Sequence, residues 1–178
     1  MPGGQFLTTD RLALRTVEEE DLPVLREYAN DPVIRRRVTG GRPRNLEGQR
    51  EQFEGMYDDV GDGVGLLACL DGEAVGYVRL FHVDMAARHA TVEYWVRPAE
   101  RRSGYGTEMV ASMLTYAVEE LRLHRVRART AATNTASRRL LESLGFVHEG
   151  VQRAAAFVGG DPVDAHRYGL LEDEWEGR

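Results

Sequence analysis

Lysine is absent from this 178-residue chain, so all 23 of its basic residues are arginines. Without a lysine amine the protein cannot form a Schiff base with a carbonyl substrate or with pyridoxal phosphate. It also lacks the lysine that phosphate-loop nucleotide triphosphatases and protein kinases use to bind phosphate. The sequence therefore excludes these kinds of chemistry.

Cysteine and long hydrophobic runs are equally scarce. Cys69 is the only cysteine, which excludes an intramolecular disulfide and a multi-cysteine zinc site and favours a reducing compartment. It stands in an apolar stretch, where a buried thiol is expected more than a nucleophile. The longest apolar run, Leu66 to Leu70, is too short to span a bilayer, and residues 1–9 lack the features of a secretion signal. We therefore expect a cytoplasmic protein without membrane contact.

Positive charge is also in deficit. The 23 basic and 29 acidic residues give a net charge of −6, which disfavours a nucleic-acid binder with a broad basic face. A local cluster remains at residues 35–44, where five arginines occur within ten positions. Such a run is usually a solvated face, although it could attract an acidic acceptor or RNA phosphates.

The length and the hydrophobic pattern predict one α/β domain over residues 1–178, with a mixed sheet. A capping box of Thr16 and Glu19 predicts a helix that ends at Asp31. The segment 109–121 has the clearest amphipathic helical pattern, and the segments 46–56 and 136–144 predict two more helices. Alternating or apolar segments predict strands over 11–15, 64–70, 74–81, 90–96, 126–130, 146–151 and 163–171.

The segment 101–107 lies between a predicted strand and the long predicted helix. Gly104 and Gly106 allow a tight turn, and the helix start presents unpaired N–H groups beside Arg101 and Arg102. These features suit a pyrophosphate, although an ordinary loop with exposed arginines would also explain them. A dinucleotide-binding loop would need a third glycine where Met109 stands, which weakens that alternative.

The motif Arg101-x-x-Gly104-x-Gly106 resembles the acetyl-coenzyme A signature of the GNAT superfamily of N-acetyltransferases. More specifically, the chain resembles the RimJ/RimL branch, which acetylates the N-terminal amines of ribosomal proteins. The resemblance extends over nearly the whole chain, through the segments 7–12 and 14–15, 93–96, 134–139, 144–146 and 149–150, residues 153 and 164, and the segments 168–171 and 174–175.

This resemblance implies a V-shaped central sheet flanked by helices. The strands 90–96 and 126–130 would splay apart to admit the pantetheine arm of acetyl-CoA. Main-chain groups near Trp95 and Val96 would pair with that arm, freed by a β-bulge. The phosphate-binding residues would be Arg101, Arg102, Ser103, Gly104, Tyr105, Gly106 and Thr107.

Glu93 is the candidate general base. It stands two residues before Trp95, so both side chains leave the same face of the strand. The resemblance implies that this carboxylate faces the active cleft, where it could take a proton from the amine directly or through water. The alternative is a surface or salt-bridged glutamate.

Asn134 and Ser137 stand at the start of the short predicted helix. An N-cap asparagine and a first-turn serine are common for structural reasons alone. The resemblance implies more: Ser137 would protonate the leaving thiolate, and Asn134 would hold the coenzyme or the local backbone. A thiol with a pKa near about 8.5 leaves with little help, so the role of Ser137 stays open at this point.

The sequence therefore predicts an acetyl-CoA-dependent transferase acting on a primary amine, either a protein N-terminus or a small molecule, by direct attack in a ternary complex. The rival hypothesis is a catalytically silent domain of the same fold that binds acyl-CoA as a sensor or structural partner. Dimers are common among such proteins, which leaves a homodimer open. No metal is expected, because the histidines show no spacing typical of ligands, at positions 82, 89, 124, 148 and 166.

Overall fold

The computed structural model describes residues 3–35, 43–57 and 63–177. The strands are β1 (Gln5–Thr8), β2 (Ala13–Thr16), β3 (Val64–Leu70), β4 (Glu73–Asp84), β5 (His89–Val96), β6 (Arg125–Ala131), β7 (Val147–Val158) and β8 (Asp161–Leu171). The helices are α1 (Leu22–Asn30), α2 (Pro32–Arg35), α3 (Leu46–Tyr57), α4 (Tyr105–Glu119) and α5 (Thr135–Ser143). The arginines at positions 36, 37 and 42 of the predicted basic cluster lie outside the described residues.

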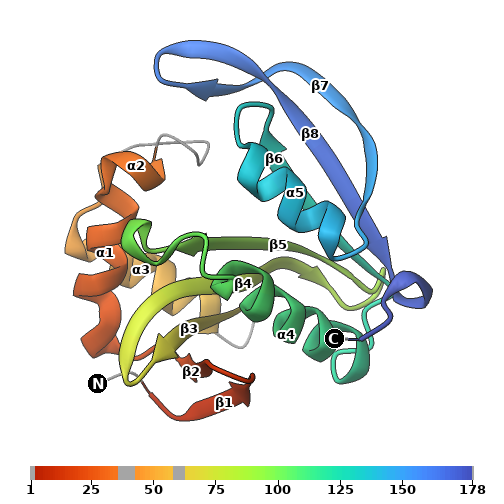
Figure 1. Ribbon diagram of the computed structural model, residues 1–178. Coiled ribbons are helices and arrows are strands. Elements are labelled where there is room, and N and C mark those ends of the chain that lie inside the picture. Colours follow the sequence, from red (N-terminus) through yellow and green to blue (C-terminus); the bar gives the residue numbers. More distant parts are fainter. Residues whose placement is uncertain (1–2, 36–42, 58–62, 178) are drawn as a thin grey trace.

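The strands form one mixed sheet in the order β1-β2-β3-β4-β5-β6-β8-β7, which confirms the predicted α/β fold (Figure 1). β5 and β6 are parallel, and the other neighbouring strands are antiparallel. The β5–β6 ladder covers only three residue pairs, from His89 with Arg125 to Thr91 with Arg127. Beyond Thr91 the two strands diverge, and this divergence produces the V shape.

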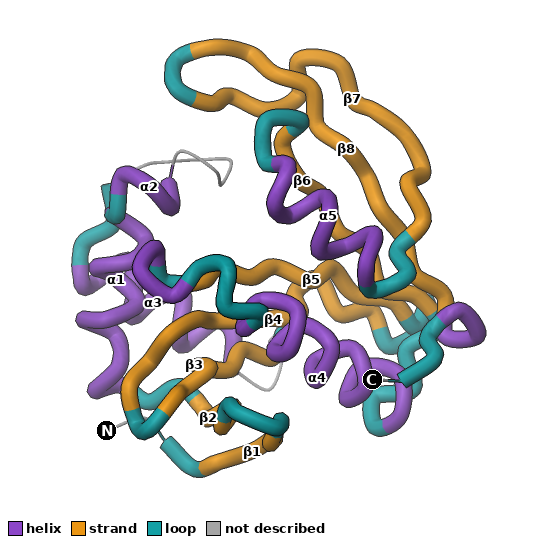
Figure 2. The backbone as a smooth tube through the Cα atoms, in the orientation of Figure 1, coloured by secondary structure: helices purple, strands orange, loops and turns teal. Residues whose placement is uncertain are grey.

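Helices cover both faces of the sheet. β3 is buried on both sides: Leu66 and Ala68 pack in the cluster that contains α4, whereas Leu67 and Cys69 pack with α1. In Figure 2, α1, α2 and α3 gather at one side of the molecule, apart from α4 and α5. The continuous apolar run of β3 reflects this burial on two faces.

α4 confirms the clearest helical pattern in the sequence. Its fully buried residues recur at three- and four-residue steps: Met109, Val110, Met113, Leu114 and Ala117. The helix is 15 residues long, and no helix in the described part of the chain is long and apolar enough to cross a membrane.

The predicted hairpin is confirmed as β3 and β4. Asp71 and Gly72, at its tip, have φ angles of 49° and 88°. Two successive positive φ values are typical of the type I′ turn, whose twist matches that of paired strands. β4 continues to Asp84, three residues beyond the predicted end.

One expectation near the N-terminus is wrong, and one strand there was not expected. The capping box is formed by Glu18 and Asp21, whose carboxylate accepts from the Glu18 N–H at 2.9 Å, and not by Thr16 and Glu19. Thr16 is instead the last residue of β2, because its main chain pairs with β3. β1 was not predicted at all, since its four residues offer too short a pattern and take their register from β2.

Candidate active site

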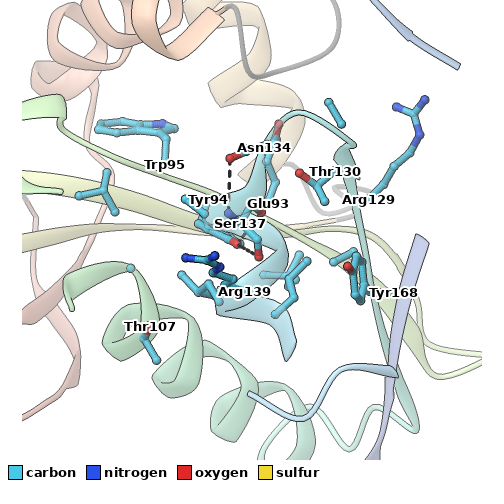
Figure 3. Close-up of a pocket in the computed structure, with 18 of the residues that line it drawn as sticks. Glu93, Tyr94, Trp95, Thr107, Arg129, Thr130, Asn134, Ser137, Arg139 and Tyr168 are labelled. Carbon is cyan, nitrogen blue, oxygen red and sulfur yellow. Dashed lines mark hydrogen bonds between the residues drawn. The ribbon is translucent and has the colours of Figure 1, made fainter. Parts of the chain in front are cut away.

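A cavity of about 1620 Å³ opens where β5 and β6 diverge. Its walls are β5, the loop before α4, the first turn of α4, β6 and α5, and we call it the central cavity. It brings together eleven of the twelve predicted site residues: Glu93, Trp95, Val96, Arg101, Arg102, Gly104, Tyr105, Gly106, Thr107, Asn134 and Ser137. The twelfth, Ser103, does not line the cavity. Figure 3 labels Glu93, Trp95, Thr107, Asn134 and Ser137 among the residues around the cavity.

Main-chain groups of β5 face this cavity. The N–H of Arg97 donates to the carbonyl of Val75 on β4 at 2.8 Å. Because hydrogen bonding alternates along an antiparallel pair, the main-chain groups of Trp95 also point to β4, whereas those of Tyr94 and Val96 point into the gap beside β6. The Val96 carbonyl there accepts from the side chain of Arg101 at 3.3 Å.

The expected bulge at Trp95 and Val96 is wrong. The β4–β5 register is continuous from Thr91 to Val96, and its irregularity lies between Phe81 and Asp84. The gap-facing groups of β5 are freed because β6 turns away after Thr91, not because an extra residue interrupts the ladder.

The loop requires glycine at positions 104 and 106 for different structural reasons. Gly104 is the N-cap of α4 with φ at +84°, a conformation that side chains other than glycine rarely adopt. Gly106 has ordinary helical geometry, but a Cβ there would lie 3.0 Å from Leu140 Cδ1 and 3.3 Å from Val96 Cγ2. Gly104 therefore permits the turn, and Gly106 permits close packing of α4 against β5 and α5.

Arg11 anchors this loop from outside the cavity. Its guanidinium donates to the Ser103 carbonyl at 2.8 Å and to the Glu108 carboxylate at 2.8 Å, and it stacks over the Tyr105 ring. No local pattern in the sequence marks this role, although Arg11 belongs to the N-terminal motif that carried the family resemblance. Its partners are about 90 residues away in the chain, so only the fold brings them together.

Because of Glu108, we expect the folded protein to lose a measurable part of its stability in acid. Partial burial raises its pKa, but hydrogen bonds from Thr9 and Arg11 lower it more, so the net pKa is lowered. A lowered folded-state pKa stabilises the protein above the unfolded pKa of about 4.3, and this stabilisation disappears as the pH falls through the folded value. We expect Glu108→Gln to cost about 1 kcal/mol at pH 7 and to flatten the fall of stability below pH 5.

Urea unfolding at pH 7, 5, 4 and 3.5 measures this effect. Glu119→Gln is the matched control, because Glu119 is an exposed glutamate on the same helix. Equal pH profiles for wild type and Glu108→Gln would contradict the prediction.

Glu93 lines the central cavity and also forms an ion pair. Arg79, directly opposite on β4, donates from Nε to Glu93 Oε2 at 2.7 Å, and its Nη2 contacts the same oxygen. The Glu93 side chain remains 33% exposed. Glu93 is therefore both a salt-bridged glutamate and a residue that lines the cavity.

Ser137 is held between Asn134 and Tyr94. Asn134 is the N-cap of α5, and its side-chain oxygen accepts from the Ser137 N–H at 3.4 Å (Figure 3). The two residues therefore have the structural role in helix capping that their positions predicted. The Ser137 hydroxyl lies 2.8 Å from the Tyr94 hydroxyl. Burial raises the pKa of Tyr94 to about 12, against the lowering effect of the hydrogen bond with Ser137. Tyr94 is therefore protonated at neutral pH.

Two histidines pair outside the cavity, which spacing alone did not predict. The β7–β8 hairpin places His148 Nε2 2.9 Å from His166 Nδ1, beside the ring of Tyr168. Residues 18 positions apart meet because the antiparallel register sets His148 opposite Tyr168, two residues beyond His166.

The cavity lies between the loop of residues 101–107 at the start of α4, which we call the glycine loop, and the diverging strands β5 and β6. Comparison with known proteins agrees with this arrangement. The model of the "Acetyltransferase (GNAT) domain" matches residues 11–147. The chain belongs to the GNAT family. It is an acetyl-CoA-dependent N-acetyltransferase with the fold that the resemblance implied.

Its relatives act on different amines. The chain is 38% identical over 123 residues to the "Putative ribosomal N-acetyltransferase YdaF" of Bacillus subtilis, a match that covers 68% of this chain and 66% of YdaF. Spermidine N-acetyltransferase from Vibrio cholerae, solved with CoA and spermine, has a TM-score of 0.86 at 22% identity, over 92% of this chain and 97% of that one. The CoA complex of RimL, a ribosomal L7/L12 α-N-protein acetyltransferase, has a TM-score of 0.84 at 17% identity, over 94% and 98%. At these identities the two structures support the fold alone.

Proposed function

We propose that this GNAT protein acetylates the α-amine of a protein or peptide, or a small primary amine, by direct attack on acetyl-CoA in a ternary complex. The observation that carries the proposal is the continuity of the central cavity. It joins the glycine loop and Ser137 on one face of β5 to Glu93 on the other. A donor and an acceptor can therefore meet at the strand without a covalent enzyme intermediate.

The residues present fit acetyl-CoA, which supplies the thioester as the acetyl donor. The start of α4 offers unpaired N–H groups and the positive end of the helix dipole for the pyrophosphate. Arg101 and Arg102 add positive charge at the same rim. The gap-facing main chain of Tyr94 and Val96 suits the amide groups of pantetheine, whereas the main chain of Trp95 faces β4, so we assign Trp95 no main-chain contact.

Glu93 and Ser137 divide the proton transfers in this proposal. Glu93 accepts a proton from the acceptor ammonium, directly or through water, while Arg79 holds its carboxylate in place. Ser137 donates its hydroxyl proton to the departing thiolate. Tyr94, protonated and 2.8 Å away, can return a proton to Ser137. Asn134 keeps Ser137 at the first turn of α5.

An α-amine is the acceptor that this machinery suits best. An α-amino group has a pKa near about 8, against about 10.4 for a lysine side chain, so far more of it is neutral at pH 7. One carboxylate base is then sufficient. The names of YdaF and RimL, which concern ribosomal substrates, favour the same choice for this chain.

An acetyl-transfer screen tests the proposed function. Peptides with free or blocked N-termini, each with and without lysine, compete with small amines, while thiol release and mass spectrometry report the product. We expect acetylation that requires a free α-amine and ignores lysine. Acetylation that follows lysine overturns the acceptor choice, and acetyl-CoA binding without thiol release from any amine favours the silent acyl-CoA-binding domain instead.

A further inference from the structure

Arginines form a row on one face of the strands that bound the central cavity. Arg125, Arg127 and Arg129 alternate along β6 with residues buried in the core, so their side chains leave the opposite face from that core. Arg167 of β8 is directly opposite Arg129. All four line the cavity.

This row lies on the acceptor side. Arg127 is in register with Thr91 on β5, and Glu93 follows two residues later on the same face. Tyr94 points the other way, toward Ser137 and α5. The arginines therefore share a wall with the proposed base, and the glycine loop is on the other side of β5.

Part of this positive charge is in no ion pair within the described segments. Glu149 neutralises Arg125, with Oε1 at 2.6 Å from its Nη2, and Arg129 donates to the Gln152 side chain and the Ala155 carbonyl. The side chains of Arg127 and Arg167 form no hydrogen bond or ion pair within the described segments, and both are exposed. The charge of Arg127 acts on Asp84 without such a contact, as one of the causes that lower the pKa of that carboxyl. We name Arg127, Arg129 and Arg167 the acceptor arginines.

The arrangement is unusual for a chain of net charge −6. Like charges directly opposite on paired strands, as at Arg129 and Arg167, destabilise a sheet. A bound anion removes that repulsion. The row therefore destabilises the folded protein when the cavity is empty, and an acidic ligand in the cavity stabilises it.

We propose that the acceptor is the N-terminal segment of an acidic peptide chain, whose carboxylates bind the acceptor arginines while its α-amine reaches Glu93. The planar guanidinium matches a carboxylate with two parallel hydrogen bonds. Alternate strand positions are about 7 Å apart, which is also the spacing of alternate side chains in an extended peptide. The same charges repel a cationic polyamine. This inference rests on the proposed function and specifies its substrate class.

Matched peptides test it. Three peptides share a free N-terminal serine and carry glutamate, glutamine or arginine at positions 3 and 5, and spermidine and free glutamate are the small acceptors. We expect kcat/KM for the glutamate peptide to exceed that for the glutamine peptide by about tenfold or more, with a preference that weakens as salt rises. Arg127→Gln and Arg167→Gln should each remove most of that preference and leave acetyl-CoA affinity unchanged.

Two comparisons keep the test independent of folding defects. Arg26→Gln removes an exposed arginine on α1, outside the cavity, and should leave the preference intact. Arg167→Glu should shift the preference toward the arginine peptide, which a misfolded variant cannot do.

Equal rates on the glutamate and glutamine peptides, or a preference for spermidine, would overturn the inference and leave the proposed transferase standing. Free glutamate turned over as well as the acidic peptide would overturn the peptide as the source of the carboxylate. Failure of every amine, with acetyl-CoA still bound, is the separate result that overturns the proposed function.

Discussion

Replacing Gly104 with valine is expected to weaken acetyl-CoA binding at least about 100-fold while the protein still folds. Gly104 has φ at +84°, and a Cβ there would lie 3.1 Å from Nη2 of Arg11, the side chain that anchors the loop. Valine must therefore move the loop, displace Arg11, or both. Either change turns the N–H groups at the start of α4 away from the proposed pyrophosphate position. Isothermal titration calorimetry with acetyl-CoA measures the loss.

Gly72→Val is the matched control for the backbone strain. Gly72 has nearly the same φ, at +88°, in the β3–β4 turn, and a Cβ there meets nothing within 4 Å. Both variants should lose about 1–2 kcal/mol of unfolding free energy from the left-handed conformation. Only Gly104→Val should lose acetyl-CoA affinity, and an unchanged affinity would refute the loop as the coenzyme site.

Removing the two proposed proton-transfer groups should lower turnover in different ways. Ser137→Ala is expected to reduce kcat about 100-fold with acetyl-CoA affinity nearly unchanged, because its hydroxyl would act mainly as the thiolate leaves. Glu93→Gln should make the rate depend on amine that is already neutral. Its kcat/KM should then rise about tenfold per pH unit up to the amine pKa near about 8.

Initial rates from pH 6 to 9, with calorimetric acetyl-CoA affinities, separate the two roles. Ser112→Ala on α4 removes a hydroxyl that does not line the central cavity and should behave as wild type. If Ser137→Ala and Glu93→Gln both keep wild-type rates at every pH, neither residue transfers protons, and positioning alone must account for catalysis.

Local chemistry made much of the fold readable from the sequence. The stripe of α4, the Asp71-Gly72 turn and the Asn134 cap each depend on residues within a few positions of one another, so their spacing predicts their structure. The missed capping box shows the limit of this reasoning. Thr16 and Glu19 have the right spacing, but pairing of Thr16 with β3 makes it part of a strand, and the helix starts later.

The site was harder to predict because its side-chain partners are distant in the chain. Arg11 with Ser103, Arg79 with Glu93 and Tyr94 with Ser137 are pairs that only tertiary packing creates. The alternating arginines at positions 125, 127 and 129 are visible as a strand pattern. Which wall of the cavity they occupy depends on the register of β6 with β5 and β8.

The sequence by itself determined that the protein has no lysine chemistry, that it is an α/β domain, and that a glycine turn precedes its longest helix, because composition and short-range periodicity carry that information. Tertiary structure alone decided where β5 and β6 part, which main-chain groups of β5 are left without a strand partner, and that Glu93 shares its wall with Arg127 and Arg167. Those features depend on strand register. A shift of one residue would turn every side chain of a strand to the other face, and no local pattern in β6 records which register the sheet adopts.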